Sequence, residues 1–221
     1  MSEAGTATDT IVFWGAGTMR TLRPIWTAEE LGVEYRLMPI GPRTGETKTP
    51  AYTRLNPKQK VPCMEQGELV LTESLVISRY LIDRYGTSET LASPRGAVAR
   101  AQEAEWLSYL YGELDETSLY VMRRHRDLAS VYGDAPAAVA SSRDYAAGHF
   151  AVVAKALGER PFLLNDRLNL ADILLVTCID WALHYDFELP ESLVRYRNEL
   201  AARPAYRRAF DVNYRSTKEQ R

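Results

Sequence analysis

The hydrophobic and polar positions in the first half of the chain change period several times, as they do where strands and helices alternate. The pattern predicts, in chain order, a strand at 10–14, a helix at 22–31 that ends at Gly32, a strand at 33–40, a hairpin of strands at 61–65 and 68–72 around Gln66 and Gly67, and a helix from about 73 to 85. The connection at 41–57 is rich in Gly, Pro, Thr and Lys, and we expect it to be irregular, with room for one short helix. This order predicts a small unit with a mixed sheet between helices.

Helical periodicity dominates after a polar linker that follows Gly86. The expected helices cover 95 to about 128, a segment from Asp134 as N-cap and Pro136 just inside to near Gly158, a central helix with Asn169 and Asp172 in capping positions, and two further stretches around Pro190 and Pro204. We therefore expect an α/β domain at 1–87 and an all-α domain at 95–221.

Composition narrows the classes of function. The chain has 46% hydrophobic and 25% charged residues and a formal net charge of -2, so no global field attracts nucleic acid or an anionic membrane. Cys63 and Cys178 are too few for a disulfide framework and too far apart for a metal site. The N-terminus lacks the pattern of a signal peptide, and no run is long enough for a membrane span. We expect a cytoplasmic protein that binds a small molecule or another protein.

The hairpin and the helix after it have the features of a binding site. Pro62 cannot donate to a sheet, and it pushes Val61 into an extended geometry that suits pairing with an extended ligand backbone. At the start of the next helix, the free N–H groups and the Ser74 hydroxyl would bind a carboxylate, and Glu73 would bind an ammonium group. The alternative is that Thr72 caps the helix and Glu73 only complements its dipole.

The connection that precedes the hairpin is basic. Between Gly41 and Lys60 one anion, Glu46, stands against five cations, which are Arg43, Lys48, Arg54, Lys58 and Lys60. Such a run is often no more than a solvated loop. Together with the strand edge and the helix start, it favours an anionic, peptide-like ligand.

The stretch "NPKQKVPCMEQGELVLTES" resembles the glutathione-binding hairpin of the cytosolic glutathione transferases, whose pattern is Asn-Pro, Val-Pro, hairpin, Glu-Ser, and the overall likeness is to the bacterial type. The likeness extends over nearly the whole chain, from "FWGAGTMRTLRPIWTAEELG" to "NLADILL", which is similar to the family's capping box. It implies a thioredoxin-like β-α-β-α-β-β-α domain followed by an all-α helical bundle, with glutathione as cosubstrate and no metal.

The resemblance also implies roles for individual residues. Val61 would pair with the cysteinyl backbone of glutathione, with the Val61-Pro62 bond cis, and Glu73 and Ser74 would hold the γ-glutamyl end. The glycyl end would be contacted by two further residues, Gln59 and Lys60.

Thr18 occupies the place where related proteins carry a catalytic Ser, Thr or Cys before the first helix. Glutathione reacts as a thiolate, and lowering a thiol pKa by about two units from near 8.5 takes roughly 2.7 kcal/mol. The Thr18 hydroxyl, the helix N-terminus and Arg20 could together supply that stabilisation. The alternative role for Thr18 is that of helix N-cap. Cys63 lies in a probable core strand, which disfavours a mechanism that uses a protein thiol.

In this family the electrophile lies against the helical domain. The candidate pocket residues are Trp106, Tyr109, Tyr120 and Arg123. Aromatic side chains at helical spacing are more often core, and an Arg near a helix end is more often solvated.

Three functions remain open. The first is a glutathione transferase that adds the thiolate to a hydrophobic electrophile. The second is a glutathione-dependent disulfide or peroxide reductase that uses two glutathiones, and the third is a non-catalytic, glutathione-binding stress or scaffold protein. The resemblance also implies a homodimer, with neither nucleic acid nor a membrane as partner.

Overall fold

The computed structural model of the chain describes residues 10–164 and 166–215. The described residues form two compact units. The first contains the residues up to Ser93 together with those from Arg203 onward, and the second runs from Pro94 to Ala202. The last helix of the chain therefore belongs, by its contacts, to the first unit.

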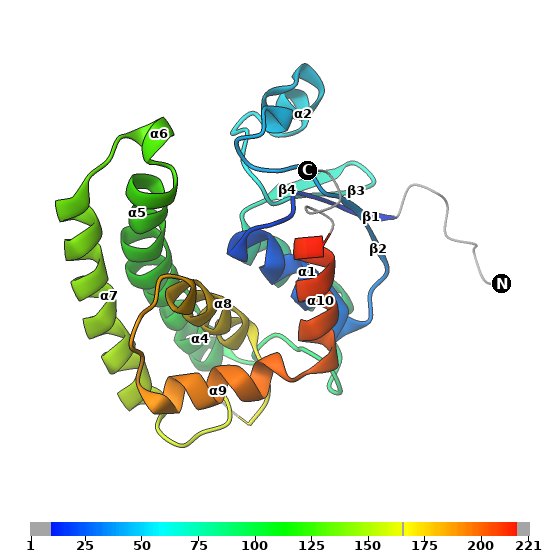
Figure 1. Cartoon of the computed structure of the whole chain (residues 1–221). Helices are drawn as coiled ribbons and strands as arrows, with labels where there is room; N and C mark the ends of the chain where they lie inside the picture. The colour runs from blue at the N-terminus through cyan, green and yellow to red at the C-terminus, as the bar shows by residue number, and fades with distance from the viewer. Residues whose placement is uncertain (1–9, 165, 216–221) are drawn as a thin grey trace. The chain divides into compact units, whose positions relative to one another are not determined.

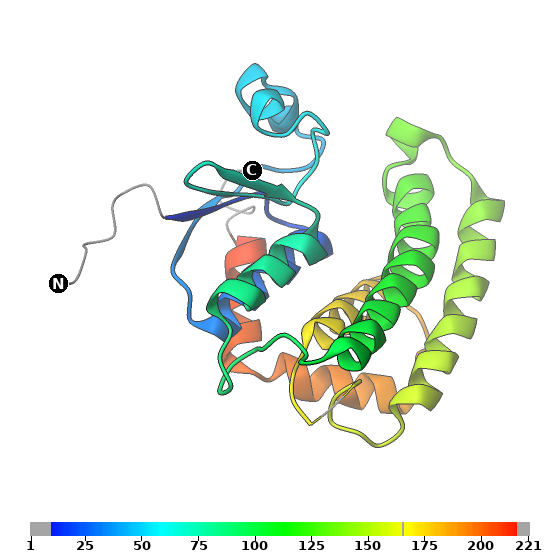
Figure 2. The same cartoon turned by 180° about the vertical axis from the view of Figure 1, so that it is seen from behind.

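The first unit is a four-stranded mixed sheet with helices on both faces (Figures 1 and 2). Its elements are β1 (Ile11–Trp14), α1 (Met19–Leu31), β2 (Tyr35–Met38), the 3-10 helix η1 (Glu46–Lys48), α2 (Pro50–Leu55), β3 (Cys63–Gln66), β4 (Leu69–Thr72), α3 (Ser74–Tyr85) and α10 (Pro204–Arg215). The strand order is β2-β1-β3-β4, in which β1 and β2 are parallel and the other pairs are antiparallel. Helices α1 and α3 lie on one face and α2 on the other. The thioredoxin-like β-α-β-α-β-β-α order is confirmed.

The core of the first unit lies between the sheet and α1 and α3. Ile11 and Phe13 alternate with half-buried residues along β1, as expected for a strand that covers a core on one face. They pack in the layer to which α1 contributes Leu22 and Trp26, both fully buried, and α3 contributes Leu81. This layer fixes the two helix N-termini next to the sheet.

Several boundaries differ from those expected: β2 covers Tyr35–Met38 rather than 33–40, and β3 covers Cys63–Gln66 rather than 61–65. Helix α1 begins at Met19 rather than Leu22, because Thr18 caps it, while its end at Gly32 is as predicted. The hairpin turn is shifted by one residue: Gln66 pairs with Leu69, so the turn consists of Gly67 and Glu68. Gly67 has φ 57°, a left-handed conformation that glycine adopts without a Cβ penalty.

The second unit is all-helical. Its elements are α4 (Ala97–Tyr109), the π-helix η2 (Leu110–Leu119), α5 (Tyr120–Met122), the π-helix η3 (Arg123–Asp127), α6 (Ala129–Tyr132), α7 (Pro136–Leu157), α8 (Leu170–His184) and α9 (Glu191–Ala201). The expected long helix at 95–128 is thus interrupted by two wider π stretches. None of the helices within 10–164 and 166–215 is long and apolar enough to cross a membrane.

The helices after the linker begin at the residues that the sequence indicated, with one exception. Asp134 was expected to cap α7, but the N-cap is Ala135, which makes no side-chain hydrogen bond to the helix, so this prediction is wrong. Pro136 lies at the start of α7, and Pro190 is the N-cap of α9. In the same way, Pro204 is the first residue of α10. In each case the missing proline N–H lies where a helix has no use for it.

The N-terminus of α8 is held by the reciprocal capping that the sequence predicted. The Asn169 side chain accepts from the N–H of Ala171 (2.9 Å), and Asp172 Oδ2 accepts from the N–H of Asn169 (2.8 Å). Asp172 Oδ1 also accepts from the N–H of Leu163 (2.7 Å) and from the Tyr196 hydroxyl (2.6 Å). Burial raises the pKa of Asp172 to about 6, although these hydrogen bonds oppose the shift.

We predict that Asp172→Ala lowers the free energy of unfolding by about 3 kcal/mol, because it leaves buried N–H and O–H groups without an acceptor. Urea unfolding followed by circular dichroism measures the change. The matched control is Asp166→Ala in the preceding loop, where the side chain is exposed and the expected change is below about 0.5 kcal/mol. Equal midpoints for the two variants would contradict the role assigned to Asp172.

Candidate functional site

The turn between β1 and α1 closely approaches Val61, in the segment that leads into β3, a strand paired on both sides. A Cβ atom built on Gly15 would lie 2.4 Å from the Val61 Cβ, and Gly15 has φ 110°. Both facts require glycine here. The Val61-Pro62 bond is cis, as the resemblance implied. The β1–α1 turn and the start of β3 therefore meet at this point.

The segment before Val61 is held in place by hydrogen bonds from α2 and from its C-cap residue, Asn56. The Tyr52 hydroxyl (2.6 Å) and Asn56 Nδ2 (2.8 Å) both donate to the carbonyl oxygen of Lys60. Gln59 has φ 53°, and its side-chain amide donates to Thr53 Oγ1 (3.0 Å). The Gln59 side chain is thus held against α2, while the Lys60 side chain is exposed.

Glu73 and Ser74 lie where β4 ends and α3 begins, and they face different surroundings. Glu73 is the N-cap residue of α3, with φ 70° and no side-chain bond to the helix, so the alternative that Thr72 caps α3 is wrong. Its exposed carboxylate accepts from Lys58 Nζ (2.6 Å), which also donates to Thr72 Oγ1 (2.5 Å). A left-handed backbone at a residue other than glycine costs about 1–3 kcal/mol and is concentrated at functional sites.

Ser74 is buried, and Arg23 lies behind it. Arg23 Nη1 donates to Ser74 Oγ at 3.3 Å, and the Arg23 side chain is fully buried within α1. A hydroxyl that accepts from a guanidinium keeps its own proton for another acceptor. The start of α3 thus combines a hydroxyl donor, a buried cation and free helical N–H groups, which together favour a carboxylate. Next to it, the Glu73 carboxylate already binds one ammonium group, that of Lys58.

Thr18 is the N-cap of α1, so the alternative role considered for it is confirmed. Its Oγ1 accepts from the N–H of Thr21 (3.0 Å), and Thr21 Oγ1 accepts from the N–H of Thr18 (3.0 Å). These bonds use the hydroxyl oxygen of Thr18 as an acceptor only, so capping leaves its proton available to a ligand. Arg20 follows in the first turn of α1 and is partly exposed.

The two cysteines lie in apolar surroundings. Cys63 is fully buried at the start of β3, and burial, with a smaller contribution from Glu65, raises the pKa of its thiol to about 11. Cys178 is fully buried in α8. Neither thiol has the exposure that a nucleophile needs, and the raised pKa of the Cys63 thiol opposes that role further.

The four residues expected to contact an electrophile are spread along α4, α5 and η3. Trp106 and Tyr109 lie in α4, and their rings meet edge to face with the ring centroids 5.8 Å apart. The Tyr109 hydroxyl is hydrogen-bonded to Nδ1 of His149 on α7 at 2.7 Å. Tyr120 begins α5, and Arg123 begins η3. The structure thus brings Trp106 and Tyr109 together and ties Tyr109 to the neighbouring helix.

Three contributors to the site had escaped the sequence reasoning. No role is assigned to Arg23 from the sequence, and Lys58 counts there only as one of five similar cations. Asn213 of α10, which bonds the Thr18 turn, had drawn no attention. A single Arg on the apolar stripe of a predicted helix is a usable signal for a buried cation, whereas the sequence carries no signal for Asn213. Within the described residues, no group of three or more His, Cys, Asp or Glu could hold a metal ion.

Comparison with known proteins gives matches over both units. Residues 9–83 match the family model "Glutathione S-transferase, N-terminal domain", and residues 102–204 match "Glutathione S-transferase, C-terminal domain". The chain is 27% identical over 184 residues to Glutathione S-transferase F14 of Arabidopsis thaliana, which covers 80% of this chain and 71% of the relative.

Two solved structures extend the comparison. A theta class glutathione S-transferase from Xanthomonas axonopodis pv. citri, solved with glutathione bound, is 28% identical with a TM-score of 0.76 over 91% of this chain and 97% of that one. The glutathione transferase URE2P8 of Phanerochaete chrysosporium, solved with oxidized glutathione, has a TM-score of 0.84 at 18% identity, over 97% and 99% of the two chains. The second likeness is one of fold.

We predict that neither thiol reacts with a disulfide reagent such as DTNB in the native protein at pH 8. With a pKa of about 11, only about one Cys63 in a thousand is ionised at that pH, and the side chain is out of reach. Both Cys63 and Cys178 should react after unfolding in guanidinium chloride. Rapid labelling of Cys63 in the folded protein would restore a protein thiol as a candidate nucleophile.

Proposed function

Because the chain belongs to the glutathione S-transferase family, we propose that its transferase reaction takes place at the site built by the β1–α1 turn, the Val61-Pro62 edge and the start of α3. In this proposal the first domain, 1–87, binds glutathione, and the helical domain, 95–221, supplies contacts to a hydrophobic electrophile. The observation that carries the proposal is the pairing of opposite charges at the start of α3. A buried cation and a hydroxyl lie beside an exposed carboxylate, as a free amino acid head group requires.

Each end of glutathione has its own partners in this proposal. Ser74 donates to the γ-glutamyl α-carboxylate, and the Arg23 charge favours that anion from behind. The ammonium group of the same moiety binds Glu73 in the place where Lys58 now donates. Val61 pairs with the cysteinyl backbone beside the cis-proline Pro62.

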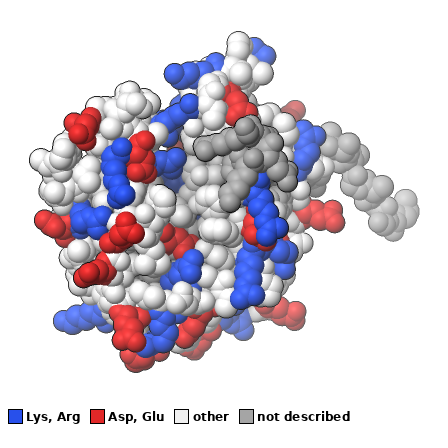
Figure 3. Space-filling view, in the orientation of Figure 1, with Lys and Arg blue, Asp and Glu red and all other residues white. Residues whose placement is uncertain are grey.

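The glycyl carboxylate lies toward the basic side of the site. Gln59 and Lys60 are its proposed contacts. The exposed Lys60 ammonium is free to move toward it, whereas the Gln59 amide must first leave Thr53. The segment 41–60 has an excess of cations over anions. Elsewhere on the face that Figure 3 displays, Lys and Arg are intermixed with Asp and Glu. The cations of 41–60 therefore act locally and at short range.

The chemical step needs a sulfur anion near the N-terminus of α1. The thiol of glutathione loses its proton to solvent, and the Thr18 hydroxyl donates a hydrogen bond to the resulting thiolate. The positive end of the α1 dipole and the Arg20 guanidinium add further stabilisation. The sulfur then forms a bond to the electrophilic carbon. In a substitution the leaving group departs with its electron pair, and in a conjugate addition the electron pair moves onto the acceptor and takes a proton.

The proposed contacts for the electrophile are Trp106, Tyr109, Tyr120 and Arg123. The Tyr109 hydroxyl is engaged by His149, so Tyr109 offers its ring rather than a polar group. We further propose a homodimer, a cytoplasmic location and the bacterial type of the family. The homodimer and the bacterial type rest on the resemblance alone, and the relatives named above come from a plant, a fungus and a bacterium.

The burial of Cys63 and Cys178 defines the second candidate, a glutathione-dependent reductase of disulfides or peroxides. Without an accessible protein thiol, each turnover needs two glutathiones. The first attacks the substrate and becomes bonded to part of it, and the second attacks the sulfur of the first, so that the two leave together as glutathione disulfide. The third candidate is a non-catalytic binding protein.

The test of the chemical step is a set of variants at Thr18, assayed with glutathione and a chloronitroaromatic electrophile. Thr18→Ala should raise the thiol pKa of bound glutathione and lower kcat/KM about tenfold at neutral pH, which corresponds to about 1.4 kcal/mol of transition-state stabilisation. Thr18→Ser should keep most of the activity. Thr18→Asp keeps an N-cap acceptor but has no hydroxyl proton and adds a negative charge beside the sulfur, so it should lose activity although α1 stays capped. If Thr18→Ala leaves the rate unchanged, Thr18 has no part in the step.

Substrate preference and glutathione binding separate the three candidate functions. A transferase should turn over chloronitroaromatics faster than hydroxyethyl disulfide, a reductase should show the reverse order, and a binding protein should retain glutathione in calorimetry without turning over either.

Ser74→Ala should raise the KM for glutathione about tenfold or more, because it removes a hydrogen bond to a charged group. A KM equal to that of the unchanged protein would exclude Ser74 from the site.

A further inference from the structure

Helix α10 places one fully buried amide, that of Asn213, against the turn that precedes α1. Asn213 Oδ1 accepts from the N–H of Gly17 (3.1 Å) and from the Thr21 hydroxyl (2.7 Å). Its Nδ2 donates to the carbonyl oxygen of Thr18 (3.1 Å), and its own carbonyl oxygen accepts from the N–H of Gly17 (2.8 Å). A residue near the end of the chain thus binds three residues of the turn that carries Thr18.

These partners fix which end of the amide faces which group. The N–H of Gly17 can only donate, so it faces Oδ1, and the Thr18 carbonyl oxygen can only accept, so it faces Nδ2. The Thr21 hydroxyl must therefore donate when it bonds Asn213. Its other possible acceptors are the carbonyl oxygen of Thr18 at 2.8 Å and Thr18 Oγ1 at 3.0 Å. Donation to Asn213 is the shortest of the three bonds, and it points the single Thr21 proton away from Thr18 Oγ1.

The direction of the remaining bond follows. Thr18 Oγ1 and Thr21 Oγ1 are 3.0 Å apart, and with the Thr21 proton committed elsewhere, Thr18 is the donor in this pair. The Thr18 oxygen meanwhile accepts from the N–H of Thr21. The Thr18 proton is thus held by one neutral hydroxyl contact, which a sulfur anion can replace with a stronger, charge-assisted bond.

We propose that Asn213 is a positioning residue for thiolate formation, which holds the Thr18 turn in place and keeps the Thr18 hydroxyl a donor. The inference rests on the role proposed for Thr18. Asn213 itself does not touch glutathione. It acts through the carbonyl oxygen of Thr18, the N–H of Gly17 and the hydroxyl of Thr21.

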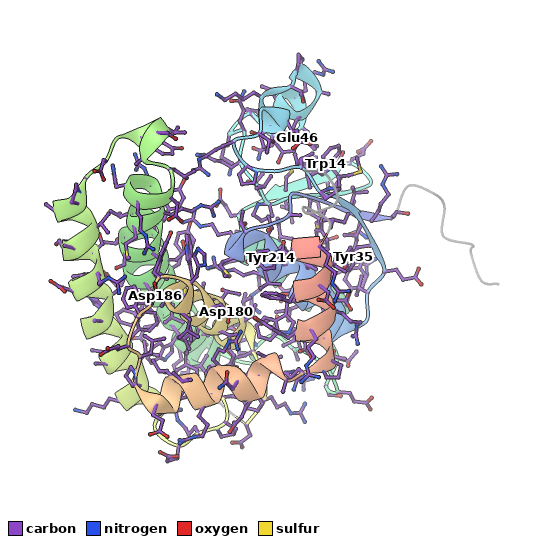
Figure 4. The ribbon with its side chains drawn as sticks, viewed as in Figure 1. Trp14, Tyr35, Glu46, Asp180, Asp186 and Tyr214 are labelled. Carbon is purple, nitrogen blue, oxygen red and sulfur yellow. The ribbon has the colours of Figure 1, made fainter. Side chains whose placement is uncertain are left out.

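The docking of α10 does not depend on Asn213, which makes its contribution measurable. Arg203 forms a bidentate ion pair with Glu30, with both N···O distances 2.7 Å. The rings of Tyr206 and Trp26 meet edge to face at 5.0 Å. Figure 1 shows α10 beside α1, and Tyr214, labelled in Figure 4, donates from α10 to Met19 Sδ at 3.2 Å.

The decisive measurement is the thiol pKa of bound glutathione, followed by the ultraviolet absorbance of the thiolate, together with the pH profile of kcat. Asn213→Ala should raise that pKa by about one unit and lower kcat about tenfold at neutral pH, with part of the rate recovered at higher pH. The KM for glutathione should change little, because the groups that bind its ends are untouched.

Asn213→Asp is the second variant, with nearly the same shape. It keeps both acceptor bonds, loses the donor to Thr18 and adds a negative charge near the sulfur, so it should raise the thiol pKa at least as far as Asn213→Ala. Arg208→Ala is the matched control on α10, since it breaks the exposed ion pair with Glu29 (2.6 Å) away from the turn. It should leave the thiol pKa and kcat unchanged.

Combination with Thr18→Ala distinguishes failure of this inference from failure of the proposed function. If the two residues act together, adding Asn213→Asp to Thr18→Ala should shift the thiol pKa by less than Asn213→Asp alone. If Thr18→Ala raises the pKa while folded Asn213 variants leave it unchanged, Asn213 is only structural and the inference is overturned. If Thr18→Ala has no effect on the pKa, the role of Thr18 falls and the inference falls with it.

Discussion

The site depends on a backbone contact that only a residue without a side chain allows. Gly15 approaches Val61 so closely that a Cβ would overlap the valine side chain. The turn after β1 can therefore lie directly against the segment that leads into β3. A side chain at Gly15 would push this turn, which leads into Thr18 and α1, away from Val61.

The electrostatics of the site follow from helix ends placed by that contact and by the sheet. The N-termini of α1 and α3 each offer the positive end of a helix dipole, and no side chain caps the first turn of α3. Arg23 adds a full charge behind Ser74, where water does not screen it. Glu73 is the local exception, an exposed carboxylate on a left-handed backbone beside Lys58. A ligand with two carboxylates, a thiol and one ammonium group matches this distribution, whereas a simple anion would leave Glu73 unused.

Features that the sequence revealed are set by short-range chemistry. The hairpin at Gly67, the left-handed Gly32 at the end of α1 and the capping pair at Asn169 each depend on residues within a few positions of one another. The error at Asp134 shows the limit of such rules. Asp134 has the right side chain for a cap, but the chain enters the helix one residue later.

The features that the sequence did not reveal are set at long range. The π stretches after Tyr109 are wider helical turns, closed by i→i+5 hydrogen bonds, and no residue pattern marks them. Asn213 lies 195 positions from Thr18, and nothing in "DVNYR" distinguishes it from a surface residue of an amphipathic helix. Its role exists only because the helices of the second unit return the chain to the first unit at Arg203. Pairings of this kind need the fold itself, since they arise from topology rather than from local preference.

The position of α10 in the chain, far from the turn that it contacts, determines when the site is completed. The sheet, α1 and α3 are all contained in the first 85 residues, so the layer that places Ser74 beside Arg23 can form early in synthesis. The amide bonds to Gly17, Thr18 and Thr21 wait for residue 213, and the contact between such distant parts of the chain carries the entropy of closing a very long loop. The groups proposed to hold glutathione and the group proposed to activate the thiol therefore mature at different stages: the first lie within the first 85 residues, and the turn around Thr18 is fixed only when α10 docks.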